Sequence, residues 1–471
     1  MSINIFDAYT LPEGFQKPDS FNSVNPSQGF TVRYLRLVAS DHDTLVSILA
    51  EANSEIRRMP VSEIIQAVGN VSNRFMDQND SLRKKALEIM GPTAGISSEM
   101  AEVILAGMAK DWTSKRLTDL LNREFATPKM LDGFQRIDSG RKQMAYGLDV
   151  NFTVGSGTVP GVGVTAMIRG LLMKSSVLLK PGLGDVALPV LFARALGEEH
   201  KVFRGCLGVV YWDGMKDRMD SQMSEKVGVV VAYGSDETIN AIRSRVPVTA
   251  NFVAYRHRLG VGLVTREALS HESATDTARS VATSVSTFDQ KGCVSPQVVY
   301  VERGGKVAPE EWVELLGTAM EKVEDNLPSG LASTEEAIGT QQLHIATELS
   351  QGRGSEALML KGASGSWTII FDSELALKWS NCKRVVYVKP ISDLDETRKI
   401  LSRSASYLQT VAVEGTENRR EAIASSLSEI GVTRVTSFKR APWPEPWWHQ
   451  DGNSVFQGLY KLIDLEDSKP R

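Results

Sequence analysis

The sequence has little cysteine, no excess of basic residues and no long apolar segment. Only three cysteines occur among 471 residues, at positions Cys206, Cys293 and Cys382, and this odd number at wide spacing fits neither a disulfide framework nor a zinc site. The formal net charge is -4, so the chain offers no overall basic surface to nucleic acid. No uninterrupted apolar run approaches the length of a membrane span. We therefore expect free thiols, no metal, no nucleic-acid partner and no membrane span.

The beginning of the chain also lacks the features of a secretory signal. The opening MSINIFDAYTLPEGFQ has no basic start followed by an apolar core. We therefore expect a cytoplasmic protein, in which a reducing environment keeps the thiols free. With 42% hydrophobic residues, the chain is long enough for two or three domains that each have their own core.

The spacing of apolar residues changes near residue 148. Before it, helical periodicity recurs, as in Ile64, Val68 and Val71, and predicts a mainly helical region over 40–125. After it, short β-branched runs such as DVNFTVG and KVGVVVAYG alternate with helical stretches such as VTAMIRGLLMK. This alternation predicts repeated βαβ units on a doubly wound parallel sheet, whose strands are apolar because both faces are covered.

Three loops that follow predicted strands have the composition of a nucleotide contact. They are GSGTVPGVG (155–163), KPGLGD (180–185) and YGSDETI (233–239). Glycine lets the backbone approach a ligand closely, and a helix N-terminus offers unpaired N–H groups to a phosphate. Turns need the same residues, so each loop alone is better explained as a turn. Their occurrence at successive strand ends, where ligands of such sheets bind, favours a ligand site.

Six residues of these loops are our candidates for nucleotide contact: Pro160, Lys180, Pro181, Gly182, Gly234 and Ser235. Lys180 is placed where its ammonium can reach a ribose or a phosphate. The usual dinucleotide fingerprint is absent, because GVGVTAMIRG contains no GxGxxG.

A cysteine and a histidine stand out further along the chain. Cys293 lies in FDQKGCVSPQVVYVE (288–302), a turn of Gly, Ser and Pro that runs into an apolar strand. It is either a nucleophile on a turn or a small buried side chain at a strand entrance. His257 lies between two arginines in VAYRHRLG, an arrangement more often solvated or structural than catalytic. The composition allows a Cys and His pair without demonstrating one.

Several blocks of the sequence resemble the long-chain acyl reductases of the LuxC type, a branch of the aldehyde dehydrogenase superfamily. The blocks are GTVPGVGVTAMIRGLLMKSSVLLKPG, VVVAYGSDETINAIRSRVPV, NFVAYRHRLGVGLV and FDQKGCVSPQVVYVE, with RRMPVSEIIQAV and LRKKALEIMG before them and APWPEPWWHQDGNSVFQGLYKLIDLE after them. The resemblance spans nearly the whole chain, and the order and spacing of the blocks make it specific.

The resemblance implies an α/β fold of the aldehyde dehydrogenase type with the active site between two domains. Residues 1–265 would form the helical N-terminal region and the cofactor domain with its doubly wound parallel sheet. Residues 266–435 would form the α/β catalytic domain with the nucleophilic cysteine, and 436–471 a C-terminal arm. The resemblance also implies a homo-oligomer, dimer or tetramer, and an acyl-transfer protein as a partner.

The implied reaction is the reduction of an acyl thioester, from coenzyme A or a carrier protein, to an aldehyde. Cys293 would expel the carrier thiol and form an acyl-cysteine that accepts hydride from a nicotinamide. Hydrolytic aldehyde dehydrogenases carry a glutamate in an ELGGK-like turn where this chain has AYRHRLG, so water attack lacks its base. His257, at the family's GH position, would exchange a proton with the carbonyl oxygen or the thiol.

Two residues depart from the family pattern. Thr158 stands where the family usually has an asparagine that assists the oxyanion, and its hydroxyl can donate one hydrogen bond over a shorter reach. Arg256 replaces the glycine that usually precedes the histidine. These departures motivate one alternative, a catalytically weakened member that binds an acyl partner or belongs to a complex. The other alternative is a coenzyme-A-acylating aldehyde dehydrogenase that works in the oxidative direction.

The nature of the cofactor follows from the loop after Lys180. An acidic residue soon after this strand would hold a ribose 2′-hydroxyl and repel a 2′-phosphate. Here the uncharged residues 181–184 separate Lys180 from Asp185. This favours NADPH, with NADH as the alternative.

Overall fold

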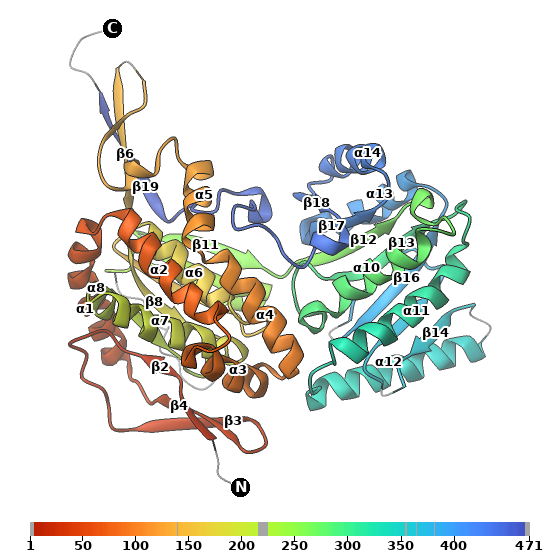
Figure 1. The fold of residues 1–471 in the computed structure, drawn as a ribbon, viewed down its shortest axis with the longest axis horizontal. Helices are drawn as coiled ribbons and strands as arrows, with labels where there is room; N and C mark the ends of the chain where they lie inside the picture. The colour runs from red at the N-terminus through yellow and green to blue at the C-terminus, as the bar shows by residue number, and fades with distance from the viewer. Residues whose placement is uncertain are drawn as a thin grey trace.

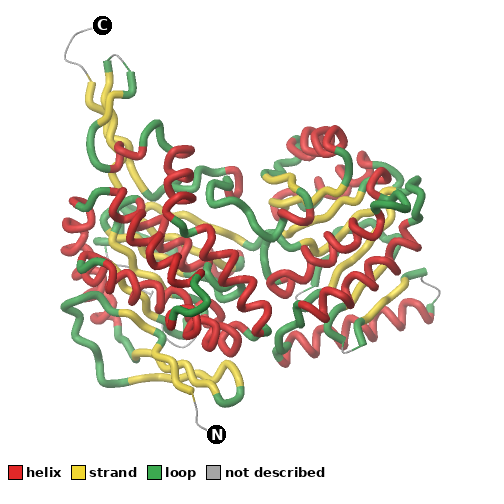
Figure 2. Tube along the Cα trace, in the orientation of Figure 1, coloured by secondary structure: helices red, strands yellow, loops and turns green. Residues whose placement is uncertain are grey.

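The computed structural model describes residues 4–138, 140–214, 225–353, 356–363, 365–380 and 382–466. Figure 1 shows two α/β lobes that lie side by side, with a narrow arm projecting from the first. The first lobe is built on a six-stranded sheet and helices α1–α9, and the second on a seven-stranded sheet and helices α10–α14. In both lobes the strands lie between layers of helices (Figure 2). Among the described residues, no helix is both long and apolar enough to cross a membrane.

The first part of the chain is a small sheet followed by five helices. Strands β1 (Asn4–Asp7), β3 (Phe21–Ser27) and β4 (Phe30–Leu35) form a three-stranded sheet, and β2 (Tyr9–Thr10) pairs with the first lobe's main sheet. The helices are α1 (Ala39–Arg58), α2 (Val61–Met76), α3 (Ser81–Ala94), α4 (Ser98–Asp111) and α5 (Ser114–Glu124). The predicted helical region over 40–125 is therefore confirmed.

Apolar residues at helical spacing and capping residues at the helix ends explain why these segments are helical. In α2 the residues with helical spacing, among them Ile64, Val68 and Val71, are fully buried. Helix α3 begins after Asp80, whose carboxylate accepts the backbone N–H of Leu82, and ends at Gly95 in the left-handed conformation.

The first lobe's sheet is parallel except at β2, and its strand order is β11-β10-β7-β8-β9-β2. Its strands are β7 (Val150–Val154), β8 (Ser176–Lys180), β9 (Leu207–Val210), β10 (Val229–Gly234) and β11 (Asn251–Arg256). Its helices are α6 (Val162–Leu172), α7 (Ala187–Glu199), α8 (Val202–Cys206) and α9 (Asp236–Arg243). The chain winds from β7 outward to β9 and then resumes on the other side at β10. This confirms the doubly wound parallel sheet, with its switch point between β7 and β10.

The second lobe's sheet has the order β14-β15-β16-β13-β12-β17-β18 and is parallel except at β14. Its strands are β12 (Leu259–Val264), β13 (Pro296–Glu302), β14 (Leu358–Lys361), β15 (Thr368–Phe371), β16 (Val385–Ile391), β17 (Leu408–Glu414) and β18 (Arg434–Thr436). Its helices are α10 (Ala274–Ser286), α11 (Pro309–Asn326), α12 (Thr334–Gly352), α13 (Leu394–Ser402) and α14 (Glu417–Ser428). Separate apolar cores cover the two faces of this sheet.

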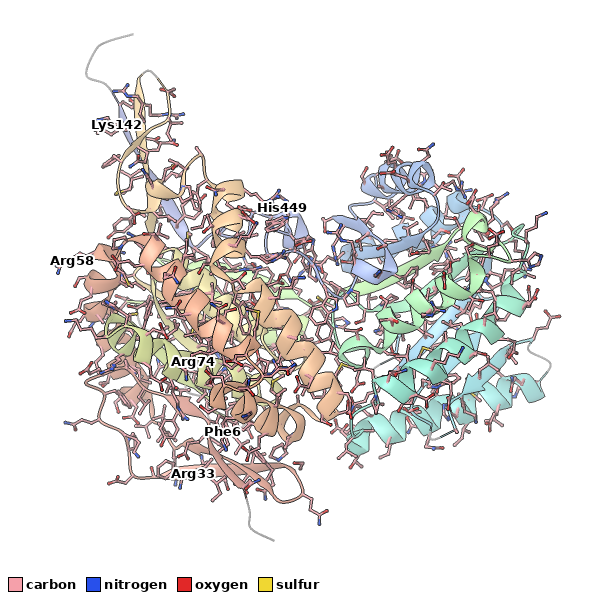
Figure 3. All side chains as sticks on the ribbon, viewed as in Figure 1. Phe6, Arg33, Arg58, Arg74, Lys142 and His449 are labelled. Carbon is pink, nitrogen blue, oxygen red and sulfur yellow. The ribbon has the colours of Figure 1, made fainter. Side chains whose placement is uncertain are left out.

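The last strand returns to the first lobe and forms the arm. Strand β19 (Tyr460–Glu466) pairs antiparallel with β6 (Arg141–Gly147), which also pairs with β5 (Gln135–Arg136). Figure 3 shows Lys142 on this arm, away from both lobes. We propose a division of the chain into the two lobes and the arm, with the change of lobe between β11 and β12.

Candidate active site

The loop before β13 carries Cys293 and has an unusual backbone. Three consecutive residues, Phe288, Asp289 and Gln290, have φ values of 59°, 51° and 63°. Residues other than glycine rarely adopt this left-handed conformation, because their Cβ crowds the backbone. Such a run persists only where the surrounding structure holds it in place.

Two buried side chains of this run hold the loop. The Nε2 of Gln290 donates to the carbonyls of Pro296 and Val385, each at 2.8 Å. The Oδ1 of Asp289 accepts from Nε of Arg384 at 3.0 Å. These hydrogen bonds with Pro296, Val385 and Arg384 therefore fix the turn that carries Cys293.

Cys293 itself is partly exposed and lies near three charged side chains. Burial, with a smaller contribution from Asp451, raises the pKa of its thiol to about 11, although Arg434 and Arg258 oppose the rise. Asp451 also forms an ion pair of 2.8 Å with Nε of Arg258. Because of this pKa, the resting thiol carries its proton at neutral pH.

The other two cysteines are placed differently. Cys206 is fully buried at the end of α8, and burial raises the pKa of its thiol strongly. Cys382 is partly exposed beside α12, where a Cβ on Gly339 would lie 3.3 Å from its sulfur. Neither of them occupies a constrained loop of the kind that holds Cys293.

A tyrosine pair of the first lobe faces Cys293. Tyr233, near the end of β10, stacks on Tyr255 with ring centroids 4.6 Å apart. Burial raises the pKa of Tyr233, Tyr255 and the Cys293 thiolate raise it further, and Arg169 lowers it. Cys293 of the second lobe is thus within electrostatic reach of the switch point of the first lobe's sheet.

The C-terminal tryptophans pack around the same loop. The ring of Trp443 lies 4.9 Å from that of Phe288, and Trp448 lies 5.1 Å from the guanidinium of Arg434. Arg434 donates in turn to the backbone carbonyls of Ala441 and Arg440 at 2.8 Å. These aromatic rings therefore support the walls of the site.

The glycine-rich loops 155–157 and 182–184 press against each other. A Cβ on Gly182 would lie 2.3 Å from the backbone nitrogen of Gly157, and one on Gly184 would lie 2.1 Å from the Gly157 carbonyl oxygen. Contact between the loops therefore accounts for these glycines. The assignment of Gly182 to a cofactor stays a prediction.

Asp185 caps the helix that follows the first of these loops. Its carboxylate is buried and accepts the backbone N–H groups of Gly161 at 2.6 Å and Gly163 at 2.7 Å. Burial raises the pKa of Asp185 to about 7, and the two hydrogen bonds oppose the rise. The N-terminus of α6 is therefore already occupied by this carboxylate.

The N-terminus of α9 is more open. Ser235 precedes it and accepts the backbone N–H of Thr238 at 3.3 Å, while Gly234 ends β10 at the switch point. Lys180 ends β8, and its Nζ lies 5.8 Å from the ring centroid of Tyr211 and 5.9 Å from that of Trp212. Both segments lie at the carboxyl edge of the sheet.

The remaining predicted residues lie on connecting segments. His257 is exposed between β11 and β12, and Thr158 is exposed with its Oγ1 at 3.2 Å from Oγ of Ser156. Pro160 is buried immediately before α6, and Pro181 is buried directly after Lys180. Within the part of the chain that the structure describes, no hydrogen bond or ion pair joins His257 or Thr158 to Cys293. Their catalytic roles stay predictions.

Sequence reasoning missed the charged and aromatic neighbours of Cys293. Arg258 adjoins His257, and Tyr233 adjoins Gly234, so proximity to these motifs was the only available signal. Arg434 and Asp451 lie more than a hundred residues beyond the cysteine in the sequence, without a motif of their own. Among the described residues, no group of His, Cys, Asp and Glu side chains is arranged to hold a metal ion.

The chain matches a known family over most of its length. The family model described as "Acyl-CoA reductase (LuxC)" covers residues 56–462. The long-chain acyl-protein thioester reductase of Photobacterium phosphoreum is 22% identical over 427 residues, which are 88% of this chain and 83% of that protein. The corresponding protein of Aliivibrio fischeri is 25% identical over 385 residues, 80% of this chain and 76% of that one.

Solved structures of aldehyde dehydrogenases share the fold. Aldehyde dehydrogenase 21 of Physcomitrella patens has a TM-score of 0.79 and 13% identity, covering 99% of this chain and 98% of that one. A putative methylmalonate-semialdehyde dehydrogenase of Sinorhizobium meliloti has a TM-score of 0.77 and 12% identity, covering 100% and 99%. The chain therefore belongs to the LuxC family of acyl-CoA reductases, oxidoreductases with the aldehyde dehydrogenase fold.

Proposed function

We propose that this protein reduces an acyl thioester to an aldehyde with NADPH, through an acyl-cysteine on Cys293. The observation that carries the proposal is the loop of Cys293, which is strained, held by buried hydrogen bonds and within electrostatic reach of Tyr233 at the switch point of the first lobe. A cysteine needed only for packing does not require three consecutive left-handed residues before it. Membership of the LuxC family supports the same reaction.

The first step of the proposed reaction is acyl transfer to the enzyme. The thiolate of Cys293 attacks the thioester carbonyl, the carbon–sulfur bond to the carrier breaks, and the carrier thiol leaves with a proton. Because the resting thiol has a pKa of about 11, a group near it must accept its proton as attack begins. His257 stays our candidate for this role, and Arg258 and Arg434 would stabilise the thiolate.

The second step transfers hydride to the acyl-cysteine. A bound reduced nicotinamide would supply this hydride. The resulting oxyanion would be stabilised by the backbone N–H of Cys293 and by Thr158 before it collapses to the aldehyde and returns the thiolate. The aromatic and arginine side chains around the loop would keep water from the acyl-cysteine.

The cofactor would lie along the carboxyl edge of the first lobe's sheet. We expect the N-terminus of α9, with Gly234 and Ser235, to contact a phosphate. Lys180, Pro181, Gly182 and Pro160 would line the adjacent part of the site. Both oxygens of Asp185 accept backbone N–H groups of α6, so this carboxylate is not free to accept a hydrogen bond from a ribose 2′-hydroxyl, which supports NADPH over NADH.

The acyl donor would be coenzyme A or a carrier protein. Relatives of this chain bear the name acyl-protein thioester reductase, which supports a protein-bound acyl group and an acyl-transfer partner. We also propose a cytoplasmic location and a homo-oligomer formed through the arm.

Exchange of the nucleophile tests the proposal. Cys293→Ala should abolish both acyl transfer from acyl-CoA and oxidation of NADPH, while Cys382→Ala keeps both. The measurements are mass spectrometry of the acyl adduct and the loss of NADPH absorbance together with detection of the aldehyde. An adduct on Cys382, or aldehyde formation by Cys293→Ala, would refute the assignment. Net conversion of aldehyde and coenzyme A to acyl-CoA would favour the alternative of an enzyme that works in the oxidative direction. If the wild type turned over substrate in neither direction, the alternative of a non-catalytic family member would be favoured.

A further inference from the structure

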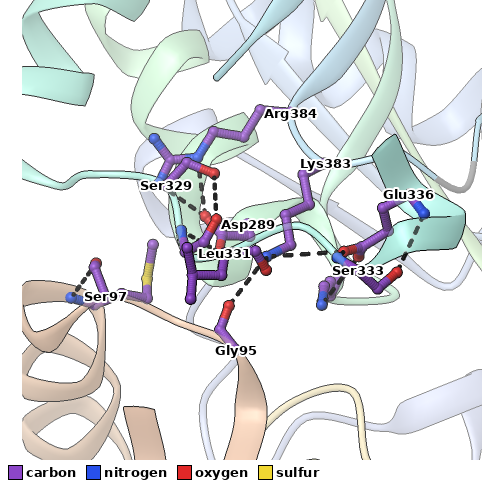
Figure 4. A network of polar contacts seen from close by, with 12 residues as sticks. Gly95, Ser97, Asp289, Ser329, Leu331, Ser333, Glu336, Lys383 and Arg384 are labelled. Atoms are coloured by element: carbon purple, nitrogen blue, oxygen red, sulfur yellow. Dashed lines mark hydrogen bonds and ion pairs between the residues drawn. The ribbon is translucent and has the colours of Figure 1, made fainter. Parts of the chain in front are cut away.

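A polar network lies where the two lobes meet and includes Asp289 of the Cys293 loop (Figure 4). At its centre is Lys383, only 8% exposed, just before β16. Its ammonium donates to the carbonyl of Gly95 at 3.0 Å and to that of Leu331 at 2.5 Å. Gly95 ends α3 of the first lobe, whereas Leu331 precedes α12 of the second. One buried cation therefore binds the backbone of both lobes.

Two carboxylates lie near the ammonium of Lys383. Oδ2 of Asp289 lies 3.8 Å from Nζ of Lys383, and Oε2 of Glu336 lies 3.9 Å from it. Burial lowers the pKa of Lys383, Lys291 lowers it further, and the two carboxylates oppose this. Asp289 is also the middle residue of the left-handed run before Cys293, so the cation is coupled to the shape of that loop.

Asp289 is held rigidly on its other side. Its carboxylate is fully buried and binds Arg384, which is also fully buried and forms a second ion pair of 2.6 Å with Glu324. The backbone N–H of Gly330 donates to Oδ2 of Asp289 at 3.1 Å. The Cys293 loop is therefore anchored to the body of the second lobe, so the hydrogen bond from Lys383 to Gly95 also sets the position of this loop relative to the first lobe.

The contact between the lobes at this point is close. A Cβ on Gly330 would lie 2.1 Å from the carbonyl oxygen of Gly95, and Oγ of Ser97 donates to the Pro328 carbonyl at 2.7 Å. On its other side, the end of α3 contacts the glycine-rich loop of the first lobe, because a Cβ on Gly184 would lie 3.5 Å from Cα of Ala94. The end of α3 thus lies between the loop assigned to the cofactor and the network under Cys293.

We propose that Lys383 is a positioning residue that sets the Cys293 loop in register with the first lobe for hydride transfer. The proposal rests on the proposed function, because the hydride donor would lie on the first lobe and the acyl-cysteine on the second. Hydride transfer needs the reacting atoms about 3 to 3.5 Å apart, and an error of about 1 Å can cost on the order of a hundredfold in rate. Attack of Cys293 on a mobile thioester depends less on the register of the lobes.

Separate measurement of the two chemical steps tests this role. Lys383→Met keeps the length of the side chain but removes the donors, Lys383→Arg retains donors, and Lys361→Met removes an exposed lysine of the same lobe that pairs with Glu348. In single-turnover experiments with acyl-CoA and NADPH, Lys383→Met should slow hydride transfer by about tenfold or more, and acylation by about threefold at most. Lys383→Arg should recover much of the loss, and Lys361→Met should match the wild type.

Hydrogen exchange gives a readout that does not depend on catalysis. In Lys383→Met, amide exchange should rise together in peptides covering 93–97 and 287–293, one from each lobe. If exchange rises in both peptides but hydride transfer is not selectively slowed, the proposal that Lys383 sets the register of the lobes is overturned. Equal slowing of both steps, or unchanged exchange at 93–97, would likewise overturn it. If Lys383→Met shows these exchange differences but the wild type reduces no thioester, the contact between the lobes stands and the proposed function fails.

Discussion

The thiol of Cys293 lies among charges that oppose one another, and its reactivity follows their balance. Burial and Asp451 favour the neutral thiol, whereas Arg434 and Arg258 favour the thiolate. The sequence pointed to the cysteine because its turn precedes an apolar strand. It could not show the charges, because β18 and the C-terminal segment bring Arg434 and Asp451 to the loop only through tertiary folding.

The pH dependence of alkylation follows from this balance. The thiolate is the reactive form, and a pKa of about 11 leaves roughly one thiol in a thousand ionised at pH 8. In a Cys382→Ser background, the rate of reaction with iodoacetamide should therefore rise about tenfold per pH unit from pH 7 to 10. A plateau below about pH 9, the range of an ordinary thiol, would show that the resting pKa is not raised.

The charge of Asp451 should slow this reaction. Asp451→Asn removes the negative charge, leaves the positive Arg258 unopposed, and so should lower the pKa of Cys293 and speed alkylation at pH 8 about threefold to tenfold. Asparagine tolerates the φ of 56° at this position and can still accept from Gln409. Asp276→Asn, at an exposed carboxylate of α10, serves as the control. A slower reaction in Asp451→Asn would mean that Asp451 acts through the shape of the loop.

At the scale of elements, the parts that the sequence predicts well are those that local pattern determines. Helix α2 and strands β7 and β10 follow from periodicity and uniform burial. The run before Cys293 does not, because Phe288 and Gln290 rarely adopt positive φ and one aspartate does not predict three such residues in succession. Hydrogen bonds with Arg384 and Val385, almost a hundred residues away, hold that conformation. Strand β3 was also unexpected, since its sequence FNSVNPS is polar, contains proline and stays partly exposed.

The cap of α6 is a second case in which a distant loop completes an element. Asp185→Ala would leave the backbone N–H groups of Gly161 and Gly163 buried without a partner. An unpaired buried donor costs about 1 to 3 kcal/mol, so we expect the free energy of unfolding to fall by about 2 to 4 kcal/mol. The measurement is the denaturant midpoint, with Asp276→Ala as the control. An unchanged midpoint would mean that water replaces the carboxylate without loss.

At the scale of the whole molecule, the proposed reaction requires the two lobes to keep their register, because the cofactor would lie on one lobe and Cys293 lies on the other. The polar network at Lys383 and the C-terminal segment that crosses from β18 to β19 both join the lobes. They contact different residues of the Cys293 loop, since Lys383 lies near Asp289 and Trp443 of the crossing segment packs on Phe288. The position of Cys293 therefore depends on both connections.

The arm gives the whole molecule a surface that one chain leaves uncovered. Leu462 and Leu465 of β19 are each 49% exposed, and Tyr146 of β6 is 37% exposed. These side chains lie on a ribbon whose outer end projects beyond the first lobe (Figure 1). An apolar strand of this kind is stabilised when a second chain covers it or extends its edge.

We expect this arm to hold the oligomer together. Leu462→Lys combined with Leu465→Lys should place one charge on each face of the ribbon and weaken self-association at least tenfold, as measured by sedimentation over a range of concentrations, because each leucine buried by association contributes about 1.5 to 3 kcal/mol. The monomer should stay folded, since neither leucine is part of a core. Ile345→Lys changes a residue that is 54% exposed on α12 and should leave association unchanged. A wild-type chain that stays monomeric, or a double variant that associates normally, would show that the arm does not form the contact.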